Sequence, residues 1–495
     1  MKKYNLSTLK IIYSFILFLL MISCQNKVEG KITTSSKEIR AYVNHIIKRH
    51  QIPGVSLAII KNDSILIQEH FGKANLEHNV PLSDSSIFRV YSLTKLPVAV
   101  ALFQLIEKEK LSLKDEVSKY IDSLPEAWNS VQIQYLITHS SGLPAMRPFP
   151  NLNKLTELEV KNLVFKEPFQ FKKGEKYDYN QTNFWLLQKI IEKVSGESLS
   201  NFIRKNQFEN EKENVFFSSN SKEIILNRVT AYFPFRNGSI EIDHPTLVGN
   251  YMLAANGLNI TLNQFIKWVK RLQENQLLKP ETQEEMWQTF NYKKSDKIFT
   301  NGWDKRIINN HISYGFSGSL VTAYRIFPDD DLSIVFLANG LGNYFNIENI
   351  INHIASLVDN DIVDINNLAF EKLSQAIVEE GKNGFQKVYA SIEKDMNFKD
   401  INLENMLNDV GYQLINQKRM DKAIDVFEFN TIQNPTSANA FDSLGEVYFI
   451  VKNFSLAIEN YQKAIDLGGT NGNAKRMLTR ISKNKIDSHF HENDK

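Results

Sequence analysis

Apolar residues dominate residues 54–72, GVSLAIIKNDSILIQEHFG, in a pattern typical of β-strands. The polar pair Asn62-Asp63 interrupts this run, and such residues favour tight turns, so we expect two strands joined there. A different spacing begins near Ser92, where apolar residues recur every three or four positions and predict a helix. The residues on this predicted helical face are Leu96, Ala99, Leu102, Phe103 and Ile106.

A second helical pattern occupies residues 177–196, YDYNQTNFWLLQKIIEKVSG. Its apolar face consists of Leu186, Leu187, Ile190, Ile191 and Val194. Gly196 follows the last apolar position, and glycine is the usual residue just past a helix end. We therefore expect this helix to stop at Gly196.

The C-terminal part of the chain repeats itself with a period of 34 residues. The matching pairs are Gly411 and Gly445, Ala423 and Ala457, Phe427 and Tyr461, and Ala440 and Ala474. This pattern resembles tetratricopeptide repeats, which are stacked helix pairs. It predicts two complete repeats and a truncated third over residues 403–482, with a helical linker over 359–402 and a polar tail over 483–495. Such repeats often present a groove to a peptide or protein partner, but a short array also serves simply to pack against its neighbouring domain.

The N-terminus is predicted to be a targeting segment. Three lysines precede an apolar run over residues 11–22, and twelve residues fall short of the roughly 20 that a membrane-spanning helix needs. The run ends in MISC, which resembles the lipobox of bacterial lipoproteins. The resemblance implies a signal peptide over residues 1–24, a lipid on Cys24, a tether over 25–36, and a place in the cell envelope facing the periplasm or exterior. The alternative is a plain secretory signal with a chance cysteine.

Composition excludes several classes of function. Lys plus Arg is 58 and Asp plus Glu is 56, with no basic block, so nucleic-acid binding has no electrostatic basis. Cys24 is the only cysteine, which rules out an intrachain disulfide, a thiolate metal site and a cysteine nucleophile. The ten histidines contain no His-Glu-x-x-His motif. We expect neither a metal nor a cofactor.

Candidate nucleophiles come from the pattern Ser-x-x-Lys, which occurs five times and is therefore unspecific alone. The five pairs are Ser7/Lys10, Ser92/Lys95, Ser219/Lys222, Ser391/Lys394 and Ser482/Lys485. Ser92/Lys95 stands at the start of a predicted helix, where a residue three positions on lies about one turn away on the same face. The simpler explanation of Ser92 is a helix N-cap.

The surroundings of Ser92 favour the chemical interpretation. FRVYSLTK at residues 88–95, followed by YLITHSSGLP at 135–144, resembles the serine β-lactamase and penicillin-binding protein superfamily. Within it, the sequence is most similar to the branch of class C β-lactamases, D-peptidases and related esterases. The likeness includes PGVSLAII, NVPLSDSSIFRV and a late strand, RIFPDDDLSIVFLANG. It implies an α+β fold over residues 37–358, with an antiparallel sheet flanked by helices.

The resemblance also implies roles for individual residues. Ser92 would be the nucleophile, with Lys95 and Tyr179 as its proton-transfer partners. The backbone N–H groups of Ser92 and Ser319 would form the oxyanion hole. Gln181 occupies the substrate-binding position at which the family motif Tyr-x-Asn has asparagine, and its extra methylene is expected to displace its contacts.

The third family motif, Lys-Thr-Gly or His-x-Gly, is assigned to the substrate-binding residues Phe316, Ser317 and Gly318. A strand that lines a substrate needs glycine where the backbone approaches closely. The alternative frame, which begins at His311, keeps an imidazole but loses the glycine. In the preferred frame Phe316 replaces the cation or imidazole that handles the substrate carboxylate in the family.

The predicted function is therefore hydrolysis of a peptide, amide or ester bond through an acyl-serine, with esterase or D-peptidase activity favoured over true β-lactamase activity. The expected partners are a small-molecule or peptide substrate, the membrane through the lipid anchor, and a protein at the repeats. The alternative is an inactive family member that binds peptidoglycan fragments or a protein. Gln181 and Phe316 favour this alternative, whereas Ser92, Lys95 and Tyr179 favour the enzyme.

Overall fold

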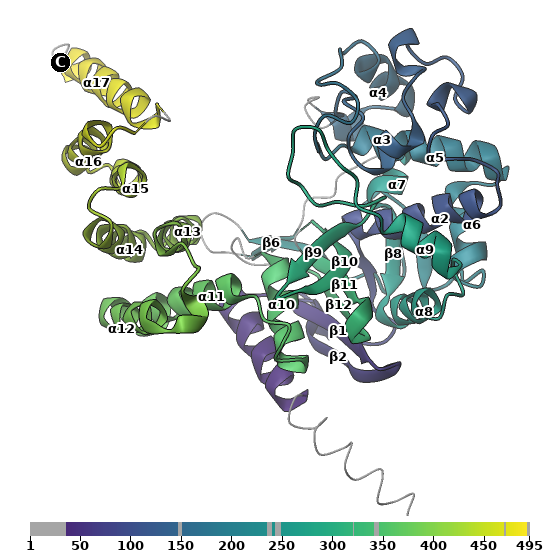
Figure 1. The fold of residues 1–495 in the computed structure, drawn as a ribbon, viewed down its shortest axis with the longest axis horizontal. Helices are drawn as coiled ribbons and strands as arrows, with labels where there is room; N and C mark the ends of the chain where they lie inside the picture. The colour runs from purple at the N-terminus through teal and green to yellow at the C-terminus, as the bar shows by residue number, and fades with distance from the viewer. Residues whose placement is uncertain are drawn as a thin grey trace, which may run out of the picture. The chain divides into compact units, whose positions relative to one another are not determined.

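The fold consists of two compact units (Figure 1). The computed structural model describes residues 36–146, 151–234, 240–242, 249–319, 321–340, 346–469 and 472–492. The first unit contains a large sheet and its helices. The second contains the C-terminal helices from Val363 onward, together with Pro234, Ile240 and residues 346–353, whereas residues 354–362 belong to the first.

The first unit is built on a seven-stranded sheet with the order β3-β2-β1-β12-β11-β10-β9. Its strands are β1 (Gly54–Lys61), β2 (Ser64–Asn75), β3 (Val80–Pro81), β9 (Asp304–Ile308), β10 (His311–Gly318), β11 (Thr322–Phe327) and β12 (Leu332–Ala338). All neighbouring strands pair antiparallel, and this confirms the α+β class expected from the sequence. Asn62 and Asp63 form the predicted turn between β1 and β2, with φ angles of 50° and 57° that both residue types tolerate.

One expectation about the sheet was too simple. The stretch RIFPDDDLSIVFLANG was expected to contribute a single strand, but it covers the end of β11 and the whole of β12. Pro328 begins the short 3₁₀ turn between them, and Asp331 ends it with a φ of 46°. Proline cannot donate to a strand ladder, which explains the break at this point.

Helices and five short strands accompany the large sheet. Residues 36–50 form the first of these helices. The other helices are α2 (Lys95–Glu107), α3 (Ile133–Ile137), α4 (Glu157–Val164), α5 (Gln181–Ser195), α6 (Leu199–Gln207), α7 (Leu253–Asn256), α8 (Leu262–Gln273) and α9 (Pro280–Met286), while α10 (Ile347–Val358) crosses the boundary between the units. β4 (Ile87–Arg89), β8 (Leu258–Thr261) and β5 (Val215–Phe217) form a small sheet in that order, and β6 (Tyr232–Pro234) pairs with β7 (Ile240–Ile242).

The core of the first unit lies around α2. Every residue of α2 from Lys95 to Leu105 is buried, as expected of a helix that is apolar on nearly all sides. It packs against α5, α6 and α9, and α8 covers β1 and β12. Figure 1 shows α3, α4 and α5 gathered into a lobe beside the sheet. Asn180 caps the start of α5 and Gly196 ends it with a φ of 72°, which confirms the predicted helix end.

The second unit is a series of helices: α11 (Ile365–Glu379), α12 (Gly381–Lys394), α13 (Leu403–Asn416), α14 (Met420–Gln433), α15 (Ala438–Ile450), α16 (Phe454–Asp466) and α17 (Asn473–Glu492). The 34-residue period has a packing basis here. A Cβ at Gly411 would lie 2.4 Å from the ring of Phe427, and one at Gly445 would lie 2.9 Å from Tyr461. In both helix pairs, glycine leaves room for the aromatic ring of the next helix.

Two boundaries in this unit differ from the prediction. The predicted linker over 359–402 contains α11 and α12, which share one apolar core with the later helices and so belong to the unit. The predicted tail over 483–495 is helical as far as Glu492, because α17 continues through it. The predicted signal peptide, most of the tether and Cys24 lie outside the described residues. Among the residues that are described, no helix is long and apolar enough to cross a membrane.

Candidate active site

Ser92 lies in a tight turn between a strand and the central helix. β4 leads into a 3₁₀ turn, Tyr91–Thr94, and α2 follows directly from Lys95. Tyr91 has a φ of 48°, which is uncommon for a bulky residue and indicates local strain. The 3₁₀ turn has Val90 as its N-cap and α2 has Thr94, so Ser92 is not the cap of either. Its half-buried side chain is therefore available for another role.

The three residues predicted to be catalytic lie together. The Tyr179 hydroxyl donates a hydrogen bond of 2.8 Å to Ser92 Oγ, although 87 residues separate the two in the chain. Lys95 is completely buried, and its ammonium donates to the carbonyl of Ala255 at 2.7 Å. Lys95 Nζ also lies 4.9 Å from the centroid of the Tyr179 ring. A hydroxyl nucleophile, a phenol and an amine thus share one enclosed site.

The glycine of the third motif lies against the turn that carries Ser92. A Cβ at Gly318 would lie 2.1 Å from the carbonyl oxygen of Val90 and 3.1 Å from the nitrogen of Ser92. Only glycine allows β10 to approach this closely. His311, the start of the alternative frame, lies at the other end of β10, about 23 Å away along the strand, and contacts Asp330 at 2.8 Å. The geometry favours the frame that ends at Gly318.

The residues around Gly318 present a ring, a hydroxyl and an exposed backbone turn. Phe316 is 9% exposed, and its ring centroid lies 6.0 Å from that of Tyr179 and 6.1 Å from that of Phe299. Ser317 is half-buried, and Ser319 is exposed with a φ of 49°. The position at which the family has a cation or imidazole is therefore part of an aromatic wall beside the tyrosine.

Gln181 is the first residue of α5 and is 3% exposed. Its Oε1 atom is buried and accepts no hydrogen bond from the described residues. An unpaired buried carbonyl costs about 1–3 kcal/mol. This oxygen therefore needs a hydrogen-bond donor from water or substrate. The displacement of its contacts by the extra methylene stays a prediction.

His139 is a site residue to which the sequence analysis gave no role. It is fully buried, its Nδ1 accepts a 3.1 Å hydrogen bond from the backbone N–H of Asn180, and its ring centroid lies 4.7 Å from that of Tyr179. Burial and the charge of Lys95 hold its pKa well below the ordinary value, so the imidazole is neutral and Nδ1 can accept. His139 thus fixes the backbone next to Tyr179. Its place within THSSG was the only signal in the sequence.

The comparison with protein families agrees with this geometry. The family model described as "Beta-lactamase" matches residues 39–355, well over half of the chain. The chain belongs to the beta-lactamase family. The match spans the Ser92 turn, Tyr179 and the strand that ends at Gly318, and it stops before α11.

Two curated proteins resemble parts of the chain. Protein flp of Staphylococcus aureus (strain MRSA252) is 26% identical over 176 residues, which cover 34% of this chain and only 35% of that protein. The teichoic acid D-alanine hydrolase of Staphylococcus aureus (strain NCTC 8325 / PS 47) is 25% identical over 292 residues, covering 58% of this chain and 70% of that protein.

Solved structures show the same fold. The octameric penicillin-binding protein homologue from Pyrococcus abyssi has a TM-score of 0.57 at 23% identity, covering 65% of this chain and 77% of that one. EstCE1, a hydrolase with promiscuous acyltransferase activity, has a TM-score of 0.56 at 17% identity, covering 67% of this chain and 99% of that one. At these identities the likeness concerns the fold.

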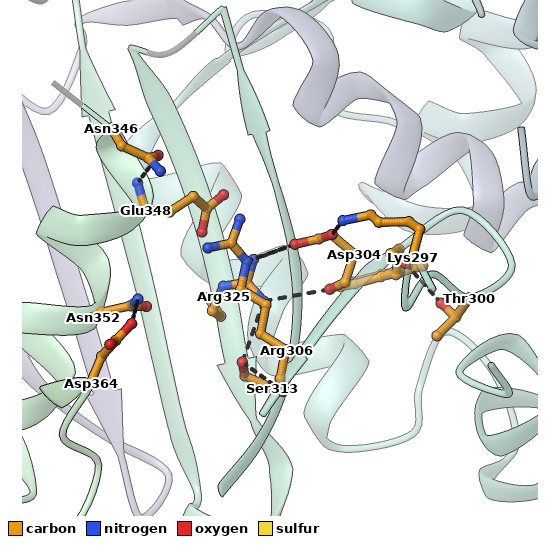
Figure 2. A network of polar contacts seen from close by, with 11 residues as sticks. Lys297, Thr300, Asp304, Arg306, Ser313, Arg325, Asn346, Glu348, Asn352 and Asp364 are labelled. Carbon is orange, nitrogen blue, oxygen red and sulfur yellow. Dashed lines mark hydrogen bonds and ion pairs between the residues drawn. The ribbon is translucent and has the colours of Figure 1, made fainter. Parts of the chain in front are cut away.

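A buried charge network supports the edge of the sheet beside β10 in this beta-lactamase-family domain. Figure 2 shows Asp304 of β9 surrounded by three cations. Its carboxylate lies 2.5 Å from Lys297, 2.8 Å from Arg306 and 3.1 Å from the fully buried Arg325. Burial alone would raise the pKa of Asp304, but the charges of Arg325, Arg306 and Lys297 together outweigh it and bring the pKa to about 2. Asp304 pairs with Gly315, one residue from Phe316, so the network holds the motif strand.

We expect Asp304→Asn to lower the free energy of unfolding of the first unit by about 3–5 kcal/mol, because it removes a charged carboxylate from the buried Arg325 guanidinium. The depressed pKa also means that the wild-type contribution is present above the unfolded-state value near pH 4 and is lost as pH falls through about 2. Urea unfolding followed by tryptophan fluorescence measures this unit alone, since all five tryptophans lie in it. Asp63→Asn, at an exposed turn, is the matched control. Equal stability of both variants would contradict the prediction.

The described residues contain no cluster of three or more His, Cys, Asp or Glu side chains that is arranged to hold a metal ion.

Proposed function

We propose that this chain is a serine hydrolase that cleaves an ester or amide bond through an acyl-serine intermediate on Ser92. The observation that carries the proposal is the 2.8 Å hydrogen bond between Tyr179 and Ser92 beside the buried amine nitrogen of Lys95. A serine hydroxyl is a weak nucleophile until a neighbouring base takes its proton. Lys95 and Tyr179 are the two groups placed for that role.

The proposed reaction has two steps. With Lys95 as a neutral amine or Tyr179 as a phenolate, the Ser92 proton passes to that base while Oγ bonds to the substrate carbonyl carbon. The resulting oxyanion is stabilised by the N–H groups of Ser92 and Ser319. The close approach of Gly318 to the nitrogen of Ser92 supports this pairing. The leaving group takes that proton from the base as its bond to the carbonyl carbon breaks. Water then gives a proton to the same base and attacks the acyl-enzyme, and the base returns the proton to Ser92 Oγ as the acyl bond breaks. No step requires a metal or cofactor.

The relatives support an ester or amide substrate. One is named a teichoic acid D-alanine hydrolase, and one structural neighbour is described as a hydrolase with acyltransferase activity. The direct test is hydrolysis of a short-chain aryl ester by the full chain, together with labelling by fluorophosphonate probes. Turnover with labelling supports the proposal. Folded protein that neither hydrolyses esters nor reacts with several probe classes would favour the alternative, a binding protein in which Gln181 and Phe316 have replaced catalytic groups.

The side chain of Phe316 leads us to expect slower hydrolysis of β-lactams than of neutral esters. β-Lactams carry a carboxylate near the scissile bond, and an ionised group stripped of water needs a charged or polar partner. Phe316 presents a ring where such a partner would stand. The lost contact should raise the activation free energy for β-lactam hydrolysis by about 1.5–3 kcal/mol, which lowers kcat/KM roughly ten- to a hundredfold. Phe316→His should raise kcat/KM for a chromogenic cephalosporin relative to an aryl ester. Efficient wild-type turnover of the cephalosporin with little ester hydrolysis would show that the interpretation of this position is wrong.

We also propose that the enzyme is anchored in the cell envelope through a lipid on Cys24. A basic start, a twelve-residue apolar run and the only cysteine at its end support this. Cys24→Ser should move the protein from the membrane fraction to the soluble fraction, or leave the signal peptide uncleaved. Mass spectrometry of the mature N-terminus is the measurement. A terminus at another residue without lipid would rule the anchor out.

A further inference from the structure

Two arginine side chains lie close to the Ser92 turn. Arg89 is the last residue of β4, and its guanidinium carbon lies 4.9 Å from the centroid of the Tyr91 ring. Arg228 lies beside the same strand, because it forms a parallel bridge with Ile87. Ile87 and Arg89 are two residues apart and therefore point to the same face of β4. Three residues of chain reach at most about 11 Å, so Arg89 is near Ser92.

Both guanidinium groups bind the loop that follows β5. Arg89 Nη2 donates to the carbonyl of Ser219 at 3.3 Å, and Arg228 Nη2 donates to that of Ser221 at 2.8 Å. These bonds use only some of the five N–H donors that each guanidinium carries. Arg89 Nε and Arg228 Nη1 are buried and have no hydrogen-bond acceptor among the described residues. Both side chains remain partly exposed to solvent.

The described carboxylates compensate this pair only in part. Within the described ranges, neither arginine forms an ion pair with an acidic side chain. The nearby Glu223 carboxylate instead accepts a hydrogen bond from Ser218 Oγ, and Arg228 binds the backbone carbonyl of Glu223. Burial and the charge of Arg89 both lower the pKa of Arg228. Two like charges with spare donors form a site that an anion would complete.

We propose that Arg89 and Arg228 bind an oxyanion, phosphate or carboxylate, carried by the substrate at a distance from the bond that Ser92 cleaves. Planar guanidinium groups match the geometry of both oxyanions. This inference rests on the proposed function and extends it to a substrate class: esters or amides of anionic molecules. It is distinct from the position of Phe316, which lies on β10 next to Tyr179.

The test compares two esters that differ only in a phosphate: acetylglycerol and acetylglycerol phosphate. We expect the wild-type full chain to prefer the phosphate ester by at least about tenfold in kcat/KM, and Arg228→Gln to reduce this ratio toward one. The ratio is the readout because it cancels a general loss of activity. Arg228→Lys keeps the charge and should keep part of the preference. Lys222→Gln, an exposed cation in the same loop, should leave the ratio unchanged.

Binding is measured separately, by the change in Tm on adding inorganic phosphate or acetate against chloride at equal ionic strength. We expect either oxyanion to raise the Tm of the wild type more than that of Arg228→Gln; a rise with phosphate alone assigns the site to phosphate. An equal rise in both proteins, or no wild-type preference between the esters, would overturn the site. Failure of both esters would count against the hydrolase itself, whereas equal hydrolysis of both would remove only the anion site.

Discussion

Ser92→Ala is expected to lower kcat/KM for an aryl ester by about 10⁴-fold or more, and to abolish labelling by fluorophosphonate probes. The reason is that Ser92 Oγ accepts a 2.8 Å hydrogen bond from Tyr179 and is the hydroxyl that we propose forms the acyl bond. Stability should change little, because Ser92 caps neither the 3₁₀ turn nor α2. The loss would therefore reflect chemistry and not unfolding.

Ser391→Ala is the matched control for this variant. Ser391 also belongs to a Ser-x-x-Lys pair, but it is exposed in α12 and lies in the helical unit. Its replacement should leave labelling and ester hydrolysis at the wild-type level. Labelling of the Ser92→Ala variant at the wild-type level would rule out Ser92 as the nucleophile.

Tyr179→Phe is expected to lower kcat for the ester by about 10²- to 10⁴-fold with a small change in KM, since a positioned proton-transfer group contributes about this much to catalysis. The variant removes only the hydroxyl that contacts Ser92. The ring keeps its packing against His139 and Phe316, at centroid distances of 4.7 Å and 6.0 Å. Substrate binding should thus survive while acylation slows.

Tyr177→Phe is the control for packing within the same aromatic cluster. Tyr177 contacts His139 and Phe299, and burial raises the pKa of its phenol, so it is not a base at neutral pH. Its replacement should reduce kcat far less than Tyr179→Phe. Similar losses in both variants would indicate that the hydroxyl of Tyr179 acts by supporting the cluster and not by transferring a proton.

Short sequence motifs predicted the three candidate catalytic residues that lie together in the structure. Ser92 and Lys95 lie in one turn of chain, and Tyr179 immediately precedes a helix whose periodicity and end at Gly196 are visible in the sequence. The turn at Asn62-Asp63 was equally clear, because those residues accept positive φ angles. These features depend on local chemistry, which a single sequence records.

Features that depend on long-range packing could not be predicted in this way. The left-handed backbone of Tyr91 has no sequence signature, since tyrosine rarely adopts it. His139 becomes a site residue only because the fold brings Asn180 to its ring nitrogen. The close approach of Gly318 to Ser92 favours one of the two motif frames, and this distance in space cannot be read from the spacing of residues along the chain.

The helical unit shows the same division. The 34-residue period identified Gly411 and Gly445 as equivalent, and the structure gives the reason in the rings of Phe427 and Tyr461. By contrast, α11 and α12 lack that period, so their part in the shared core was not visible in the sequence. A contact that recurs in each repeat produces a periodic pattern in the sequence, whereas a contact that occurs once produces none.

The central claim is that Ser92 forms the acyl bond, and peptide mapping of the labelled protein tests it most directly. The full chain is treated with a fluorophosphonate, its intact mass is measured, and the modified peptide is sequenced by mass spectrometry. The account predicts one adduct per chain, on Ser92 within the peptide that contains FRVYSLTK. An adduct on another serine, or folded wild-type protein that remains unmodified by several probe classes, would contradict it.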